Sequence, residues 1–179
     1  MHTLLVGAPG VGKSTLIRRV LAELDRPVFG FETKKETAGE GGGGLVYLYP
    51  AGGERRRTGE NLAGRCGSRR GSVQVFPEVF DRFAPRLRGP VPAGHVVLMD
   101  ELGFMEAGSE AFCDAVFALL DGEAPVLAAV KDREIPFLDR VRAHPKCRSF
   151  FLTPENRERM FVEVLEQMRL QLGGGQGGR

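Results

Sequence analysis

The sequence contains no long hydrophobic run and few cysteines. No apolar stretch approaches the ~20 residues that a membrane-spanning helix requires, which argues against a helical membrane protein. Cys66, Cys113 and Cys147 are far apart, and no two of them have the CxxC spacing of a metal site. We therefore expect neither structural zinc nor a disulfide framework, and we interpret the cysteines as reduced thiols.

A strong charge of either sign is also missing. The formal net charge of +2 is too near zero to indicate a nucleic-acid partner by itself. Hydrophobic residues make up 42% of the chain and charged residues 27%, which is typical of soluble globular domains. Length and composition predict one domain over residues 1–172, followed by a glycine-rich tail, 173–179, that we expect to be disordered.

Short apolar segments alternate with amphipathic segments along most of the chain. Strands are predicted at residues 2–6, 28–31, 45–49, 72–76, 96–99, 125–130 and 150–152, and helices at 13–24, 77–87, 109–120, 135–142 and from 153 onward. The continuous apolar strands are typical of a parallel sheet that is covered on both faces. The pattern predicts an α/β fold, a three-layer sandwich around a mostly parallel central sheet, with an irregular basic insertion at about 37–71.

The most specific motif fits G-x-x-x-x-G-K-[ST] and lies between a predicted strand and a predicted helix. It comprises Gly7, Ala8, Pro9, Gly10, Val11, Gly12, Lys13 and Ser14. In such a P-loop, backbone N–H groups and the N-terminus of the helix face phosphate oxygens. Lys13 can contact the terminal phosphates and neutralise charge during catalysis, Ser14 can bind Mg²⁺, and Thr15 is expected beside the α-phosphate. The motif predicts a P-loop NTPase fold that binds a nucleoside triphosphate with Mg²⁺.

A second motif ends the strand predicted at 96–99. Four apolar residues followed by Asp100 and Glu101 match a Walker B segment, whose acidic end lies at the ligand-binding edge of an open α/β sheet. We expect Asp100 to hold Mg²⁺ together with Ser14. Glu101 is the candidate that orients and deprotonates an attacking water. The alternative interpretation makes Glu101 a solvated loop carboxylate.

Asn156 and Arg157 follow the last predicted strand, so they are expected on the nucleotide side of the sheet. Arg157 can stack on the base or approach the phosphates, and Asn156 can form a hydrogen bond nearby. Ordinary polarity at the start of a helix is an equally good explanation of both residues.

Two further patterns bear on function. Residues 100–103 fit the DxxG of switch GTPases, but no NKxD motif follows a later strand, which argues against a guanine-specific switch. The segment 54–70 has six arginines against Glu54 and Glu60. Solvated loop charge is the first interpretation of this segment, and contacts with phosphate or nucleic acid are the second. Few aromatic residues lie between these arginines, so a nucleic-acid partner has no further support.

Taken together, these motifs resemble the THEP-type, or cancer-related, nucleoside-triphosphatases. The resemblance rests on GAPGVGKSTL at 7–16, GFET at 30–33, MDELGFME at 99–106 and TPENRE at 153–158, in this order. It implies Mg²⁺-dependent hydrolysis of ATP, GTP and other triphosphates to the diphosphate and phosphate, with Glu101 as the base. Members usually carry two glutamates and an arginine shortly after GF-x-T. This chain instead has Lys34, Lys35, Glu36 and Thr37, so the roles of those family residues do not transfer.

Two other functions fit the same motifs. A small-molecule or nucleotide kinase would need an acceptor pocket and an arginine-rich lid, which residues 54–70 can supply. A nucleotide-gated module would bind RNA or protein through the same basic segment. The P-loop begins so near the N-terminus that a cleaved leader would destroy it, and we therefore expect a cytoplasmic protein. Its expected partner is a nucleoside triphosphate, and its expected state is a monomer.

Overall fold

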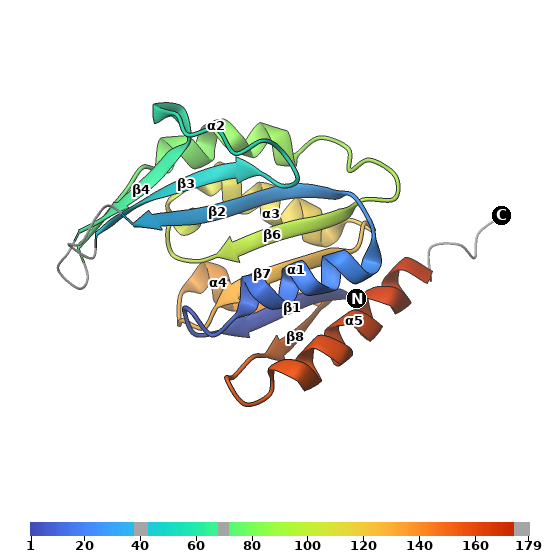
Figure 1. The fold of residues 1–179 in the computed structure, drawn as a ribbon. Coiled ribbons are helices and arrows are strands. Elements are labelled where there is room, and N and C mark those ends of the chain that lie inside the picture. Colours follow the sequence, from blue (N-terminus) through green and yellow to red (C-terminus); the bar gives the residue numbers. More distant parts are fainter. Residues whose placement is uncertain (38–42, 68–71, 174–179) are drawn as a thin grey trace.

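One eight-stranded sheet organises the chain (Figure 1). The computed structural model describes residues 1–37, 43–67 and 72–173. The strands are β1 His2–Gly7, β2 Val28–Thr37, β3 Gly44–Pro50, β4 Leu62–Cys66, β5 Val73–Val75, β6 Val96–Leu102, β7 Val126–Lys131 and β8 Cys147–Phe151. The α-helices are α1 Lys13–Leu24, α2 Pro77–Leu87, α3 Glu110–Asp121, α4 Pro136–Arg142 and α5 Arg157–Gly173, with short 3₁₀ turns at Gly59–Asn61 and Glu106–Gly108.

The sheet has a parallel part and an antiparallel part. Its strand order is β5-β4-β3-β2-β6-β7-β1-β8. Every pairing from β2 to β8 is parallel, and β3, β4 and β5 continue the sheet as antiparallel strands. The carboxyl ends of the parallel strands therefore meet at one edge, the left edge of Figure 1, where the loop between β1 and α1 also lies. Ligands of open α/β sheets bind at such an edge.

Helices cover both faces of this sheet. The buried side chains of α1 and α5 share one apolar cluster with the sheet, and those of α2, α3 and α4 share another on the opposite face. Phe112 of α3 lies at the centre of the second cluster, with its ring centroid 4.9 Å from that of Phe31 and 5.2 Å from that of Phe80. The predicted three-layer α/β sandwich is thus confirmed. In the described part of the chain, no helix combines the length and apolarity needed to cross a membrane.

The segment expected to be an irregular insertion contributes two strands to the sheet: β3, which overlaps the strand predicted at 45–49, and β4, which was not predicted. β2 does not end at Phe31 but continues to Thr37, because its second half pairs with β3. β4 then pairs with β3, so antiparallel ladders satisfy the backbone of this region. Residues 38–42, 68–71 and 174–179, which include most of the glycine run and the tail expected to be disordered, lie outside the described residues.

The last helix begins later than the Thr153-Pro154 pair predicts. The Asn156 side chain accepts a hydrogen bond from the Thr153 backbone N–H at 2.9 Å and donates one to the Phe151 carbonyl at 2.9 Å. These bonds close a loop over the residues in between, so α5 starts at Arg157. At the other end α5 includes Gly173, the first residue of the predicted tail. The predicted N-cap at Ser109 is confirmed, since its hydroxyl accepts from the Phe112 N–H.

Gly30 of β2 lies opposite Leu98 of β6, and its substitution tests this packing. Its φ is +125°, and a Cβ there would come within 2.2 Å of the Leu98 carbonyl oxygen. Gly30→Ala should therefore lower the free energy of unfolding by about 3 kcal/mol. Gly94→Ala is the control, because Gly94 also has a positive φ (+78°) but no atom within 4 Å of the added Cβ. That change should cost about 1 kcal/mol. Equal losses in urea unfolding would contradict the proposed clash.

Candidate active site

The loop between β1 and α1 is shaped by two glycines. Gly10 has a φ of +77° and Gly12 a φ of +110°, a region of backbone conformation that other residues rarely adopt. Gly12 directly precedes α1, so the unpaired N–H groups of the first helical turn open toward the loop. The sequence therefore builds a ready anion site at this helix N-terminus.

Lys13 is buried at the base of this loop, with 4% of its surface exposed. Its Nζ donates hydrogen bonds to the carbonyl oxygens of Gly7 at 2.7 Å and Ala8 at 2.9 Å. The same atom lies 3.3 Å from Glu101 Oε2. A buried ammonium group requires such partners, and these hold Lys13 directly beside the loop.

Ser14 and Asp100 come together from different elements, as the motifs predict. The Ser14 hydroxyl donates to Asp100 Oδ1 at 2.7 Å, and Asp100 is only 2% exposed. No cluster of three or more acidic, histidine or cysteine residues that could hold a metal ion occurs within residues 1–37, 43–67 and 72–173. A hydroxyl and one carboxylate nevertheless fit Mg²⁺, which usually takes one or two carboxylates and fills its remaining positions with water and substrate phosphates.

Glu101 lies between two lysines. Its Oε1 is 3.1 Å from Lys131 Nζ and its Oε2 is 3.3 Å from Lys13 Nζ. The Glu101 backbone N–H also donates to the Thr33 hydroxyl at 3.2 Å. With 23% of its side chain exposed, Glu101 keeps access to solvent and also has two fixed cationic partners, which a solvated loop carboxylate would lack.

Arg157 and Asn156 differ in their surroundings. Arg157 Nε donates to the Val11 carbonyl at 2.9 Å, and its guanidinium packs against Gly12. Arg157 is therefore brought to the P-loop. Asn156 uses its side-chain amide within its own loop, as described above. A direct contact of either residue with nucleotide stays a prediction.

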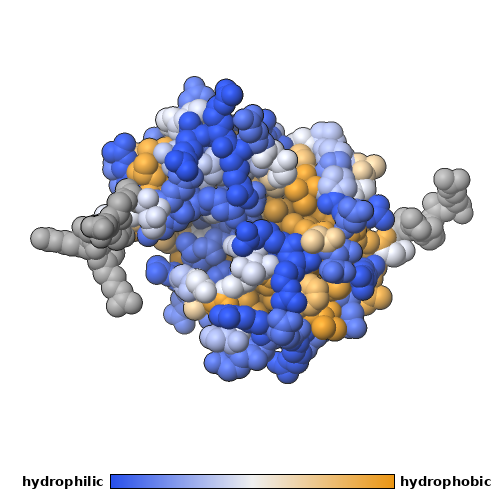
Figure 2. All heavy atoms as spheres, in the orientation of Figure 1, coloured by the Kyte–Doolittle hydropathy of each residue, from blue (hydrophilic) through white to orange (hydrophobic). Residues whose placement is uncertain are grey.

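Lys13, Ser14, Asp100 and Glu101 line one cavity of about 600 Å³, which appears as a hollow among hydrophilic residues in Figure 2, whereas Asn156 and Arg157 lie outside its lining. Its lining also includes Thr15, Arg18, Thr33, Lys34, Arg55 and Lys131. Thr33, Lys34 and Lys131 line the cavity but were not predicted as site residues. Their positions along the chain could have indicated them. Each lies in the carboxyl-terminal half of its strand, and Lys131 directly follows an apolar run.

Glu106 forms the inner wall of the cavity beyond Glu101. Its Oε2 accepts a hydrogen bond from the Gly103 N–H at 2.8 Å, and only 3% of the residue is exposed. Burial raises the pKa of Glu106 from its ordinary 4.5 to about 7, although backbone N–H groups and Lys131 act in the opposite direction. The site thus contains a carboxyl group that changes charge near neutral pH.

Comparison with known proteins identifies the family. The family described as NTPase matches residues 2–165. Nucleoside-triphosphatase THEP1 of Pyrococcus abyssi is 34% identical over 177 residues, which cover 97% of this chain and 95% of that protein. The chain belongs to the THEP1 family of nucleoside-triphosphatases. The cancer-related nucleoside-triphosphatase homolog of Bos taurus is 31% identical over 183 residues, covering 94% of this chain and 96% of that protein.

Two solved structures of the THEP1 family have the same fold. The crystal structure of THEP1 from Aquifex aeolicus matches with a TM-score of 0.67 at 25% identity, covering 94% of this chain and 99% of that one. The solution structure of a human cancer-related nucleoside triphosphatase matches with a TM-score of 0.61 at 26% identity, covering 99% and 98%. The fold described here is therefore the fold of the family.

Glu106→Gln should change stability in a pH-dependent way. Because folded Glu106 keeps its proton up to about pH 7 and the unfolded chain loses it near 4.5, the free energy of unfolding of the wild type falls as the pH rises through this interval. A glutamine cannot ionise, and its amide oxygen can still accept from Gly103. The unfolding temperature of the variant relative to wild type should therefore rise between these pH values and stay constant above them. A difference that does not vary with pH would contradict the raised pKa.

Proposed function

We propose that this protein is a Mg²⁺-dependent nucleoside-triphosphatase that hydrolyses ATP, GTP and other nucleoside triphosphates to the diphosphate and phosphate. As a member of the THEP1 family it is a hydrolase of acid anhydrides. The observation that best supports Mg²⁺-dependent hydrolysis is the 2.7 Å hydrogen bond from Ser14 to Asp100, next to Glu101 in the same cavity. It brings the metal ligands and the candidate base to the phosphate-binding loop.

The loop and α1 bind and orient the triphosphate. Backbone N–H groups at Gly10 and Gly12 and the first turn of α1 face the phosphate oxygens. Lys13, already fixed at the base of the loop, contacts the terminal phosphates as a point charge. Ser14 and Asp100 would hold Mg²⁺, which offsets the negative charge of the phosphates.

Glu101 acts on the attacking water. Its carboxylate accepts the proton of the water as the oxygen bonds to the γ-phosphorus, and the bond to the β-phosphate oxygen breaks. Lys131 keeps the carboxylate in place through the 3.1 Å contact when Lys13 turns to the phosphates. The products are inorganic phosphate and the nucleoside diphosphate.

Broad base specificity follows from where the binding groups lie. The P-loop groups contact phosphates, which are the same in every nucleotide. No NKxD motif is present to select guanine. We therefore propose that the purine and pyrimidine triphosphates are all substrates.

Two of the six arginines in the basic segment favour hydrolysis over phosphoryl transfer to a second substrate. Arg55 is paired with Glu32 at 3.0 Å, and Arg57 is paired with Glu36 of β2. A kinase lid requires arginines that close over the phosphates, whereas these two are tied to the sheet.

Glu101→Gln tests the proposed base directly. The amide cannot take a proton, so phosphate release should fall by about 100-fold or more while nucleotide binding persists. Lys13→Ala should lose both, because Lys13 contacts the phosphates themselves. Phosphate release from ATP and the binding of a fluorescent ATP analogue are the measurements.

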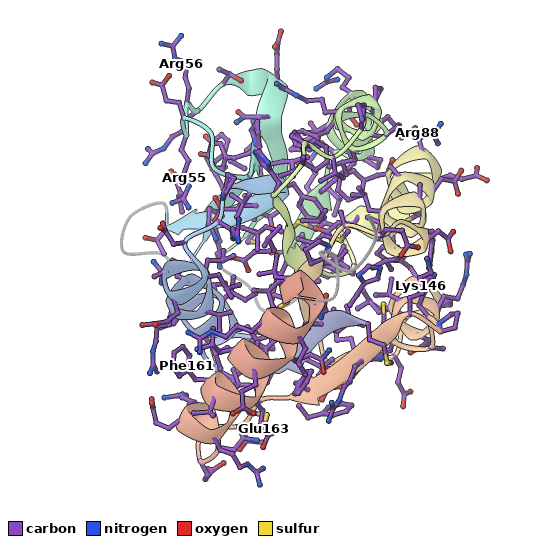
Figure 3. All side chains as sticks on the ribbon, turned by 90° about the vertical axis from the view of Figure 1, so that its right-hand side faces the viewer. Arg55, Arg56, Arg88, Lys146, Phe161 and Glu163 are labelled. Atoms are coloured by element: carbon purple, nitrogen blue, oxygen red, sulfur yellow. The ribbon has the colours of Figure 1, made fainter. Side chains whose placement is uncertain are left out.

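The matched control for Glu101→Gln is Glu163→Gln. Glu163 is a carboxylate on the surface of α5, 3.6 Å from Arg159 and outside the cavity lining (Figure 3). It should keep both wild-type release and wild-type binding. Wild-type turnover by Glu101→Gln would remove Glu101 from the mechanism, and turnover that required an added phosphate acceptor would favour a kinase instead.

A further inference from the structure

Lys34 occupies an unusual place in the cavity. It lies on β2, two residues beyond Glu32, and the register of β2 against β6 sets Glu32 directly opposite Asp100. Lys34 Nζ donates to Asp100 Oδ2 at 2.7 Å and lies 3.2 Å from Glu32 Oε1. One quarter of its side chain is exposed. A partly exposed ammonium group thus pairs with the acid that would bind the metal.

Several other cations in or beside the cavity hold different partners, and Arg18, which also lines it, bonds to the Ser14 carbonyl and the Thr15 hydroxyl. Lys13 bonds to loop carbonyls, Lys131 pairs with Glu101, Arg55 pairs with Glu32, and Arg157 bonds to the P-loop backbone. Among the described residues that line the cavity, Lys34 is the cation paired with Asp100. Its position therefore depends on whether Asp100 has another cation to bind.

Lys34 and a metal ion would compete for the carboxylate of Asp100, because both are cations. The carboxylate is nearly fully buried, so it needs a counter-charge when no metal is present, and Lys34 supplies one. A divalent cation on Asp100 would repel an ammonium group held a few ångströms away. Lys34 has a flexible four-carbon stem and keeps a second partner in Glu32, so it can move without leaving the cavity.

We propose that Lys34 is a catalytic cation that neutralises Asp100 before metal binding and contacts the terminal phosphate after it. The proposal rests on the proposed hydrolysis and adds to Lys13 a second group that offsets charge on the γ-phosphate oxygens, a role filled by an arginine in many phosphoryl-transfer enzymes. Lys34 does not change which bonds form and break in the hydrolysis. Water bonds to the γ-phosphorus, the diphosphate oxygen leaves with the electron pair, Glu101 takes the proton, and Lys34 forms no covalent bond.

The competition predicts a measurable coupling between metal and nucleotide. Without Mg²⁺, Lys34 shields the phosphates from the negative charge of Asp100, so removing the lysine charge should weaken metal-free triphosphate binding strongly. With Mg²⁺ present, Asp100 is already neutralised and the same change should matter less. The factor by which Mg²⁺ strengthens triphosphate binding should therefore be about tenfold larger in Lys34→Gln than in wild type.

The experiment compares Lys34→Gln, Lys34→Arg and Lys146→Gln with wild type. The glutamine can still donate a hydrogen bond to Asp100 and so preserves the fold, while the arginine preserves the charge. Lys146 pairs with Glu123 on the surface, outside the cavity lining and across the molecule from Arg55 in Figure 3, and controls for loss of one positive charge. Binding of a fluorescent non-hydrolysable ATP analogue and of fluorescent ADP is measured with Mg²⁺ and with EDTA. Phosphate release from ATP and unfolding temperature are measured alongside.

The expected result has three parts. Lys34→Gln raises the coupling factor, lowers turnover at least about tenfold, and weakens Mg²⁺-bound triphosphate more than Mg²⁺-bound diphosphate. Lys34→Arg restores the coupling and part of the turnover, and Lys146→Gln behaves as wild type. Unchanged turnover or an unchanged coupling factor in Lys34→Gln would overturn the proposal. A wild-type protein that releases no phosphate refutes hydrolysis instead, and the binding measurements then decide the role of Lys34 separately.

Discussion

The hydrogen bond from Ser14 to Asp100 is the contact on which the site depends. Ser14 belongs to the first turn of α1 and Asp100 to β6, and β7 separates β6 from the strand that leads into the loop. The contact is possible because these strands run parallel, so that both residues reach the same edge of the sheet. A change of register or direction in either strand would separate the phosphate-binding loop from the acid. The apolar packing on both faces of the sheet is thus what positions the charged site.

The same site concentrates the buried charge of the molecule. Among the described residues, the buried carboxylates and ammonium groups are Lys13, Glu32, Asp100 and Glu106. Each lines the cavity or is paired with a residue that does. Burial of such groups is costly unless each has a partner of opposite charge or a hydrogen bond. Clusters of buried charged groups are common where binding or catalysis requires them, and here the cluster surrounds the P-loop.

The sequence predicted the parts of this site that depend on local pattern. The P-loop and the Asp100-Glu101 pair were predicted from their spacing along the chain, and the structure brings them together through the Ser14–Asp100 and Lys13–Glu101 contacts. Lys34 and Lys131 were not found, because their role comes from strand register between segments far apart in the chain. The irregular insertion was mispredicted for a related reason. β3 was predicted as a strand at 45–49, but β4 was not, because β4 is stabilised by antiparallel pairing with β3, which no local periodicity reveals.

The central claim is that these groups act together as a metal-dependent hydrolytic site. Phosphate release by the wild-type protein from ATP, GTP, CTP and UTP, without an acceptor and in Mg²⁺ or EDTA, is the most direct measurement. Release from all four triphosphates is expected in Mg²⁺ and only background release in EDTA, because Ser14 and Asp100 would hold the metal that offsets the charge of the phosphates. Equal release in EDTA, or none in Mg²⁺ from a protein that binds nucleotide, would contradict it.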